Sequence, residues 1–196
     1  MTRRPAVARR RTGDGAGKPA PSTLPFTEQV AKGREHALRL LAIRERSAME
    51  IRIRLRQRGY APEAIVAILE RLQGVDLQSD RRYADRFATE AAARGKSSRL
   101  IQGELRGKGV EPDLAAQAAA ASDQEDRARA LALARKKALG MRSLPPEVRS
   151  RRILGMLARR GYDPQTCRLV AAEVSGRSED DLDGGFLDPD SEPDVP

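Results

Sequence analysis

The sequence predicts an all-α protein of three tandem three-helix repeats, elongated and segmentally flexible, with disordered N- and C-terminal tails. The segment Leu55–Pro62 recurs as Leu105–Pro112 and Leu157–Pro164, and the glycines within it are 50 and 52 residues apart. A fixed period of this size is typical of repeat architectures. Period-two runs of β-branched and aromatic residues are absent, and Ala, Leu, Arg and Glu dominate, so we expect no strands. Only 3% of residues are aromatic, so we expect thin helical cores.

Each copy of this segment predicts a helix, a tight turn and a second helix. Glycine takes the left-handed conformation that ends a helix. Leu55 and Tyr60 stand on either side of Gly59, where the apolar pair of a Schellman motif belongs. Pro62 then falls at the first position of the next helix, where its missing N–H does no harm.

The rest of each repeat follows from apolar spacing and capping residues. An isoleucine stands four residues before each of these leucines, on the same helical face, at Ile51, Ile101 and Ile153. Ser47 and Glu50 form a capping box that starts the first of these helices. Helices are also expected before and after them, at 28–45, 81–94 and 124–139 and at 64–72, 114–121 and 167–174. The expected domains are a basic arm at 1–22, repeats at 23–76, 77–122 and 123–176, and an acidic tail at 177–196.

Two finer expectations concern helix starts and contacts between repeats. Asp163 should cap its helix well, whereas Ala61 and Glu111 are poor capping residues. Met49 and Ile53 form a second apolar pair on their helix. Packing between repeats explains this pair more simply than contact with a partner does.

The sequence predicts no catalytic, cofactor or metal site. The single cysteine, Cys167, and the single histidine, His36, cannot form a zinc site alone. Cys167 is expected to be a buried thiol on an apolar stripe, and His36 a surface or core-edge residue. Residues 103–108 lack the hydroxyl that follows Gly-Lys in a phosphate-binding loop. One cysteine allows no internal disulfide, which suits a reducing cytosol, and no apolar run is long enough to span a membrane.

Charge is unevenly distributed along the chain. Residues 1–21 carry +5, and residues 178–196 carry −8. Subtracting both from the net charge of +9 leaves +12 for the helical body between them. A body this basic predicts a polyanion or an acidic protein surface as partner, the alternative being that surface arginine keeps an alanine-rich protein soluble. The tail is expected either to compete weakly with a polyanion for the body or to serve solubility alone.

The candidate binding residues are six arginines, Arg52, Arg56, Arg99, Arg106, Arg152 and Arg159. Arg56 and Arg106 occupy equivalent places in their repeats and point away from the apolar stripe. Spacings of four or seven residues put each successive pair on one helical face. The alternative is that these are ordinary solvated faces. Arg58, Lys108 and Arg160 directly precede the helix-ending glycines, so the partial negative charge of the helix end explains them.

Several segments, in this order and spacing, resemble the RecX family. Residues 37–47 are similar to its A-L-x-x-L-x-x-R-x-x-S pattern, and 50–55 with 58–60 resemble its E-L-x-x-K-L…K-G-[FY] segment. Ser79–Ala84 resembles its D-D-x-x-[FY]-A segment, with serine in place of the first acid. Leu105–Val110 and Leu157–Tyr162 resemble its second and third repeat ends, so the resemblance covers about residues 34–175.

The resemblance implies a non-enzymatic regulator of the RecA recombinase. RecX proteins have three tandem three-helix repeats, bind RecA nucleoprotein filaments in the filament groove, and restrain ATP hydrolysis and strand exchange. The expected role is therefore inhibition of RecA in homologous recombination, DNA repair and the SOS response. The expected partners of this cytoplasmic monomer are the RecA filament and single- or double-stranded DNA, bound weakly and non-specifically, with no membrane and no cofactor. The alternative is a general nucleic-acid-binding or transcription-related helical protein, since three-helix units also read DNA grooves.

Overall fold

The computed structural model describes residues 20–121 and 123–176, and within these ranges the regular secondary structure is entirely helical. The α-helices are α1 (Phe26–Ile43), α2 (Ala48–Gln57), α3 (Pro62–Gly74), α4 (Asp80–Ala93), α5 (Ser98–Gly107), α6 (Pro112–Ala120), α7 (Asp126–Leu139), α8 (Pro146–Arg159) and α9 (Pro164–Ser175). Short 3-10 helices, Pro21–Thr23 and Asp123–Glu125, precede α1 and α7. Apart from residues 20–22, the expected basic arm lies outside the described residues, as does the acidic tail. No described helix is long and apolar enough to cross a membrane.

Each successive group of three helices encloses its own core. The second helix of every group contributes a fully buried isoleucine and leucine, namely Ile51 with Leu55, Ile101 with Leu105, and Ile153 with Leu157. Burying one such side chain contributes about 1.5–3 kcal/mol, so these pairs anchor their cores. The second core is otherwise mostly alanine, with Ala84, Ala88, Ala91, Ala115, Ala118 and Ala119. The predicted all-α fold of three tandem three-helix repeats is confirmed.

The glycine of each recurring segment ends the second helix of its repeat as predicted. Gly59, Gly109 and Gly161 have φ angles of 83°, 77° and 83°, in the left-handed region. The residue after each glycine donates its N–H to the carbonyl of the segment's leucine, at 3.3 Å from Tyr60 to Leu55, 3.1 Å from Val110 to Leu105 and 3.3 Å from Tyr162 to Leu157. These bonds complete a Schellman motif in all three repeats.

The helix starts agree with the sequence, with two exceptions. The capping box at Ser47 forms only in part, because the Glu50 carboxylate pairs with Arg44 at 3.1 Å and does not accept the N–H of Ser47. Ser47 caps α2 and Asp163 caps α9, each by accepting the N–H of the residue three positions on, at 3.1 Å and 2.9 Å. No side chain caps α3 at Ala61. The expectation for Glu111 is wrong, because its carboxylate accepts the N–H of Leu114 at 3.0 Å and so caps α6. The partial positive charge at a helix start favours such an anionic group.

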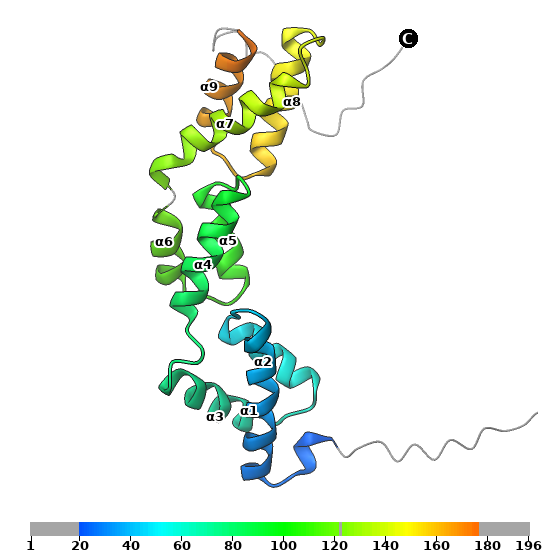
Figure 1. Cartoon of the computed structure of the whole chain (residues 1–196), viewed down its shortest axis with the longest axis vertical. Helices are drawn as coiled ribbons and strands as arrows, with labels where there is room; N and C mark the ends of the chain where they lie inside the picture. Colours follow the sequence, from blue (N-terminus) through cyan, green and yellow to red (C-terminus); the bar gives the residue numbers. More distant parts are fainter. Residues whose placement is uncertain (1–19, 122, 177–196) are drawn as a thin grey trace, which may run out of the picture.

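The second helices of the three repeats meet end to end along the long axis of the elongated molecule (Figure 1). Where the end of α8 meets the start of α5, the N–H of Ser97 donates to the carbonyl of Arg160 at 3.0 Å. Where the end of α5 meets the start of α2, the hydroxyl of Ser47 donates to the carbonyl of Lys108 at 2.7 Å. The last carbonyls of a helix have no partner within it, so each repeat supplies a bond that its neighbour lacks.

The helix-ending glycines are also needed for the close approach of the helices at these junctions. A Cβ on Gly161 would lie 2.5 Å from the Cβ of Leu100, and a Cβ on Gly109 would collide with Met49. Met49 therefore packs between repeats as predicted. The structure corrects the same expectation for Ile53, which is 47% exposed, because the junction covers only the first turn of α2.

An aspartate at the start of each following repeat caps the second helix of the repeat before it. Asp80, the first residue of α4, accepts the N–H of Ala48 at 2.8 Å. Asp126, the first residue of α7, accepts the N–H of Ser98 at 2.9 Å. Each carboxylate satisfies a free N–H and complements the positive end of the capped helix. These bonds fix the orientation of successive repeats.

The second helices α2, α5 and α8 form an end-to-end row, which we call the helix stack. Its two outer ends differ from the junctions between repeats. Next to repeat 1, the N–H of Ser22 donates to the carbonyl of Gly59 at 2.9 Å, so the segment before α1 takes the place of a neighbouring repeat. A Cβ on Gly59 would meet Pro21 and Ala20 at ordinary distances of 3.5 Å and 3.9 Å. At the other end, α8 begins with Pro145 at the cap and Pro146 in the first turn, without a side-chain cap.

Candidate nucleic-acid interface

The six candidate arginines all lie exposed on the second helices α2, α5 and α8. Within residues 20–121 and 123–176, their side chains form no ion pair or hydrogen bond. Exposed guanidinium groups without a carboxylate keep their charge and their donors available for a partner. What distinguishes a binding face from a solvated one is therefore how these arginines are grouped.

Arg152 and Arg159 are the candidate pair that the structure gathers into a hollow. The hollow lies between the end of α7 and the length of α8, and its volume is about 670 Å³. We call it the α7–α8 groove. Five cations and no acid line it, namely Lys137, Arg151, Arg152, Arg159 and Arg160. Such a concentration of one sign of charge attracts phosphate or carboxylate groups.

The floor of the α7–α8 groove is apolar. Met141 is buried and Met156 half-buried, while Gly140 and Gly155 add no side chain. A Cβ on Gly155 would lie 3.3 Å from Nη1 of Arg159, so this guanidinium lies back over the glycine. A ligand that combines anionic groups with some apolar surface therefore fits the groove better than a small ion does.

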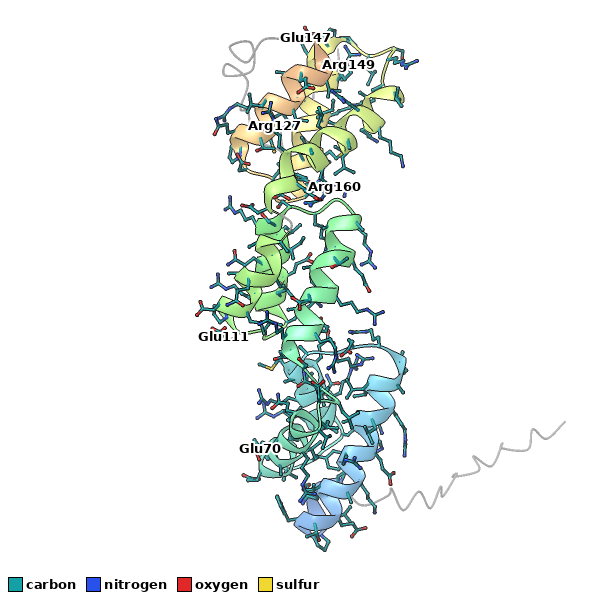
Figure 2. All side chains as sticks on the ribbon, turned by 60° about the vertical axis from the view of Figure 1, so that its left-hand side comes forward. Glu70, Glu111, Arg127, Glu147, Arg149 and Arg160 are labelled. Atoms are coloured by element: carbon teal, nitrogen blue, oxygen red, sulfur yellow. The ribbon has the colours of Figure 1, made fainter. Side chains whose placement is uncertain are left out.

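Arg160 belongs both to the groove and to the junction with repeat 2, where Figure 2 places it. Its Nη1 donates to the carbonyl of Arg94, at the end of α4. The side chain is half-buried, whereas the other four groove cations are exposed. Arg160 is thus held by the fold, and the charge it brings to the groove is fixed in place.

Sequence reasoning missed two of the groove cations, Arg151 and Lys137. Arg151 stands 52 residues after Arg99, the same spacing as between the second and third glycines, so the repeat pattern could have indicated it. Lys137 comes from a different helix, and no spacing along the chain relates it to Arg152. The groove is therefore a product of how α7 crosses α8.

The other two candidate pairs lie outside the α7–α8 groove, Arg52 with Arg56 on α2 and Arg99 with Arg106 on α5. A second hollow, of about 330 Å³, lies at the junction of repeats 1 and 2, and none of these four lines it. Its cations are paired with acids, as in the Arg86–Glu90 contact of 3.0 Å. The unpaired cations of the described hollows are those of the α7–α8 groove.

Comparison with known proteins identifies the family. Models of the first, second and third three-helix domains of RecX match residues 34–72, 79–118 and 124–170. The chain belongs to the RecX family. The α7–α8 groove lies wholly within the third RecX domain.

Relatives that carry the RecX name match most of the chain. Regulatory protein RecX of Mycobacterium avium is 38% identical over 169 residues, covering 84% of this chain and 96% of that protein. Regulatory protein RecX of Thermobifida fusca is 36% identical over 167 residues, covering 84% and 90%. The crystal structure of RecX from Lactobacillus salivarius has a TM-score of 0.65 at 22% identity, covering 74% of this chain and 96% of that one, and it shares the fold.

Cys167 lies in the core of the third repeat, and His36 lies half-buried at the edge of the first repeat's core. Burial raises the pKa of the Cys167 thiol to about 11, and its Sγ donates to the carbonyl of Tyr162 at 3.5 Å. Nδ1 of His36 lies 2.6 Å from the hydroxyl of Tyr60, and burial lowers the pKa of this imidazole. Both placements agree with the sequence prediction. Among the described residues, no group of His, Cys, Asp and Glu side chains could hold a metal ion.

Proposed function

We propose that the protein is a non-enzymatic regulator that binds RecA nucleoprotein filaments and lowers their ATPase and strand-exchange activities. Its relatives are named regulatory protein RecX, and all three RecX domains are present. The observation that carries the proposal is the α7–α8 groove, which offers five cations and no acid to the phosphates of filament DNA. The proposed setting is recombination and DNA repair in the cytoplasm.

The groove has the chemistry of a phosphate-backbone site. Its arginines can donate paired hydrogen bonds to phosphate oxygens, and Lys137 adds a point charge. No Asn, Gln, Asp or Glu lines the groove to read adenine or cytosine, so any base contact there would come from Arg or Lys to guanine. If about four phosphates are contacted, log K should fall with log salt at a slope of roughly −3 to −4.

The end-to-end stack of helices suits a filament as partner. The three repeats extend along one axis (Figure 1), so the first two can lie against RecA subunits while the third contacts DNA. Arg52 and Arg56 on α2, with Arg99 and Arg106 on α5, are the proposed contacts to acidic RecA surfaces or to further phosphates. One elongated monomer would thereby restrain several neighbouring subunits at once.

Two double variants test this division of roles on RecA bound to single-stranded DNA. Arg152→Ala with Arg159→Ala removes two groove cations, and Arg52→Ala with Arg56→Ala removes the same charge from α2. We expect substoichiometric wild-type protein to lower ATP hydrolysis by RecA. The groove variant should bind DNA roughly tenfold more weakly, with the salt slope flattened by about 2, and the α2 variant should lose less.

Each possible failure points to a different part of the proposal. An ATPase rate that excess wild-type protein leaves unchanged would reject RecA regulation and favour the general nucleic-acid-binding alternative. Equal losses of DNA affinity in the two double variants would assign binding to overall charge rather than to the groove. A strong preference for one duplex sequence would favour a transcription-related role.

A further inference from the structure

We propose that an acidic segment of the C-terminal tail, residues 179–187, docks in the α7–α8 groove and competes there with DNA. The docking follows from the charge of the groove, from its apolar floor and from the place where the chain leaves α9. The competition rests on the proposed function, since it requires that DNA bind the same groove.

The segment and the groove are complementary in charge. Four carboxylates fall within five residues, at Glu179, Asp180, Asp181 and Asp183. The groove presents five cations and no acid. In the hollow at the first junction, by contrast, Arg86 is already paired with Glu90. Of the two hollows described, the α7–α8 groove is the one in which the segment's carboxylates meet no competing acid.

The segment and the groove are also complementary in apolar surface. Three apolar residues interrupt or follow the run of acids, namely Leu182, Phe186 and Leu187. The groove floor is formed by Met141 and Met156, and methionine side chains adapt to irregular apolar partners. A phosphate backbone cannot use this floor fully, whereas a peptide that mixes carboxylates with Leu and Phe can.

The chain leaves α9 within reach of the groove. Nη2 of Arg149 donates to the carbonyl of Ser175 at 3.3 Å, so the end of α9 lies against the first turn of α8. From Arg149, α8 rises about 15 Å to Arg159, and Figure 2 shows Arg149 and Arg160 at opposite ends of repeat 3. Residues 179–183 follow Ser175 by four to eight positions, and an extended chain of that length spans about 13–26 Å.

Buried polar atoms without a hydrogen-bond partner lie near the point where the chain leaves α9. Nε of Arg149, Oγ of Ser150 and Oγ of Ser175 are buried and have no hydrogen-bond partner among the described residues. Buried polar groups in folded proteins are nearly always satisfied. In the docked state, polar groups of the chain that follows Gly176 would satisfy them and so start the segment along α8.

Two full-length quadruple variants with equal changes of charge test the docking. The proximal variant carries Glu179→Gln, Asp180→Asn, Asp181→Asn and Asp183→Asn, and the distal control carries Asp188→Asn, Asp190→Asn, Glu192→Gln and Asp194→Asn. Backbone amide NMR of labelled protein reports docking without DNA or RecA. We expect the amides of Gly140 and Gly155 to shift between wild type and the proximal variant at about 0.05 M salt, and the difference to vanish near 1 M salt, where the Debye length is about 3 Å. The distal control should shift the amide signals of Gly140 and Gly155 less.

The outcomes separate the docking from the proposed function. Groove amides that stay unchanged in the proximal variant, or that move no more than amides along α2 and α5, would overturn the docking. Fluorescence anisotropy with a single-stranded oligonucleotide tests competition, and the proximal variant should bind about fivefold more tightly at low salt. Shifted groove amides with unchanged DNA affinity would support the docking and overturn the groove as the DNA site. Unchanged amides with DNA binding that still depends on Arg152 and Arg159 would overturn the docking and leave the DNA site standing.

Discussion

The two junctions between repeats share one geometry and differ in chemistry. At both, an aspartate of the following repeat caps the second helix of the preceding one, and a glycine-terminated helix end abuts it. The supporting contacts at the first junction are ion pairs. Lys108 of repeat 2 lies 3.7 Å from Glu50 of repeat 1, and Arg82 of repeat 2 lies 2.8 Å from Glu45 of repeat 1.

At the second junction, two side chains of repeat 3 donate hydrogen bonds to uncharged carbonyls at the end of α4. Arg160 donates to the carbonyl of Arg94, and the hydroxyl of Tyr162 donates to the carbonyl of Gly95 at 3.2 Å. Such bonds do not require an ionised carboxylate, and salt screens them less than exposed ion pairs. Aspartate and glycine therefore set the orientation of the repeats, and the contacts around them can differ in kind.

Adding a methyl group at a junction glycine should have the largest effect. Gly161→Ala forces alanine to a positive φ and presses its Cβ against Leu100, and together these should cost about 3 kcal/mol or more. Gly59→Ala is the matched control, because it shares the φ of 83° but its Cβ would make only ordinary contacts, with Pro21 and Ala20, so about 1 kcal/mol is expected. Urea unfolding measures both losses. Equal losses would show that the stack does not depend on close approach.

Removing a junction aspartate should have the next largest effect. Each removal should lower the free energy of unfolding by about 2 kcal/mol. Asp126→Ala should cost more than Asp80→Ala, because Asp126 also pairs with Arg129, whose side chain is only 14% exposed. Asp113→Ala, at an exposed position in the first turn of α6, is the control and should change stability little. Thermal unfolding compares the three variants. Midpoints that do not distinguish the junction variants from the control would contradict the capping role.

Salt should affect the two junctions differently, by about 1 kcal/mol in the free energy of unfolding. Glu50→Gln removes the carboxylate that faces Lys108 across the first junction, and Tyr162→Phe removes a hydroxyl donor from the second. We expect the loss of stability in the Glu50 variant to shrink in about 1 M salt and that in the Tyr162 variant to persist. The measurement is the urea midpoint at low and high salt. The same salt dependence in both variants would refute the difference in chemistry.

Alkaline pH should destabilise the protein through Tyr83. Burial, with a further contribution from Glu50, raises the pKa of Tyr83 from its ordinary 10.0 to about 12. The folded protein holds this phenolic proton more tightly than the unfolded chain, so the stabilisation is complete below pH 10 and is lost as the pH rises toward 12. Tyr83→Phe should remove that part of the alkaline loss of stability. An absorbance titration in which Tyr83 of the folded protein ionises near pH 10 would contradict it.

The sequence predicted the features that depend on neighbours within one or two helical turns. Leu55, Gly59 and Pro62 specify a helix end and a helix start because both motifs span only a few residues. The spacing of Arg152 and Arg159 likewise placed them on one face of α8. The groove around them could not be predicted, because Lys137 and Met141 come from another segment of the chain.

Contacts between distant residues account for the rest. The bond from the N–H of Ala48 to Asp80 spans 32 residues, and in sequence Asp80 looks like any acid in a first helical turn. Apolar spacing grouped Ile53 with Met49, but spacing does not tell how far along α2 a neighbouring repeat reaches. Such features depend on how whole repeats meet rather than on local preference.

The structure at the two outer ends of the helix stack limits how many three-helix repeats can be joined in one row. In repeat 1, Ser22 is bonded to the carbonyl of Gly59, next to the Arg58 position that corresponds to the junction carbonyls, so the segment before α1 covers the end of α2. At the start of α8, Pro145 and Pro146 have no N–H to offer to the helix end of a fourth unit. Molecules are thereby prevented from polymerising head to tail through the surfaces that join their own repeats. An engineer who wished to lengthen the array would need to replace this proline pair with a serine-capped start, as well as add a repeat.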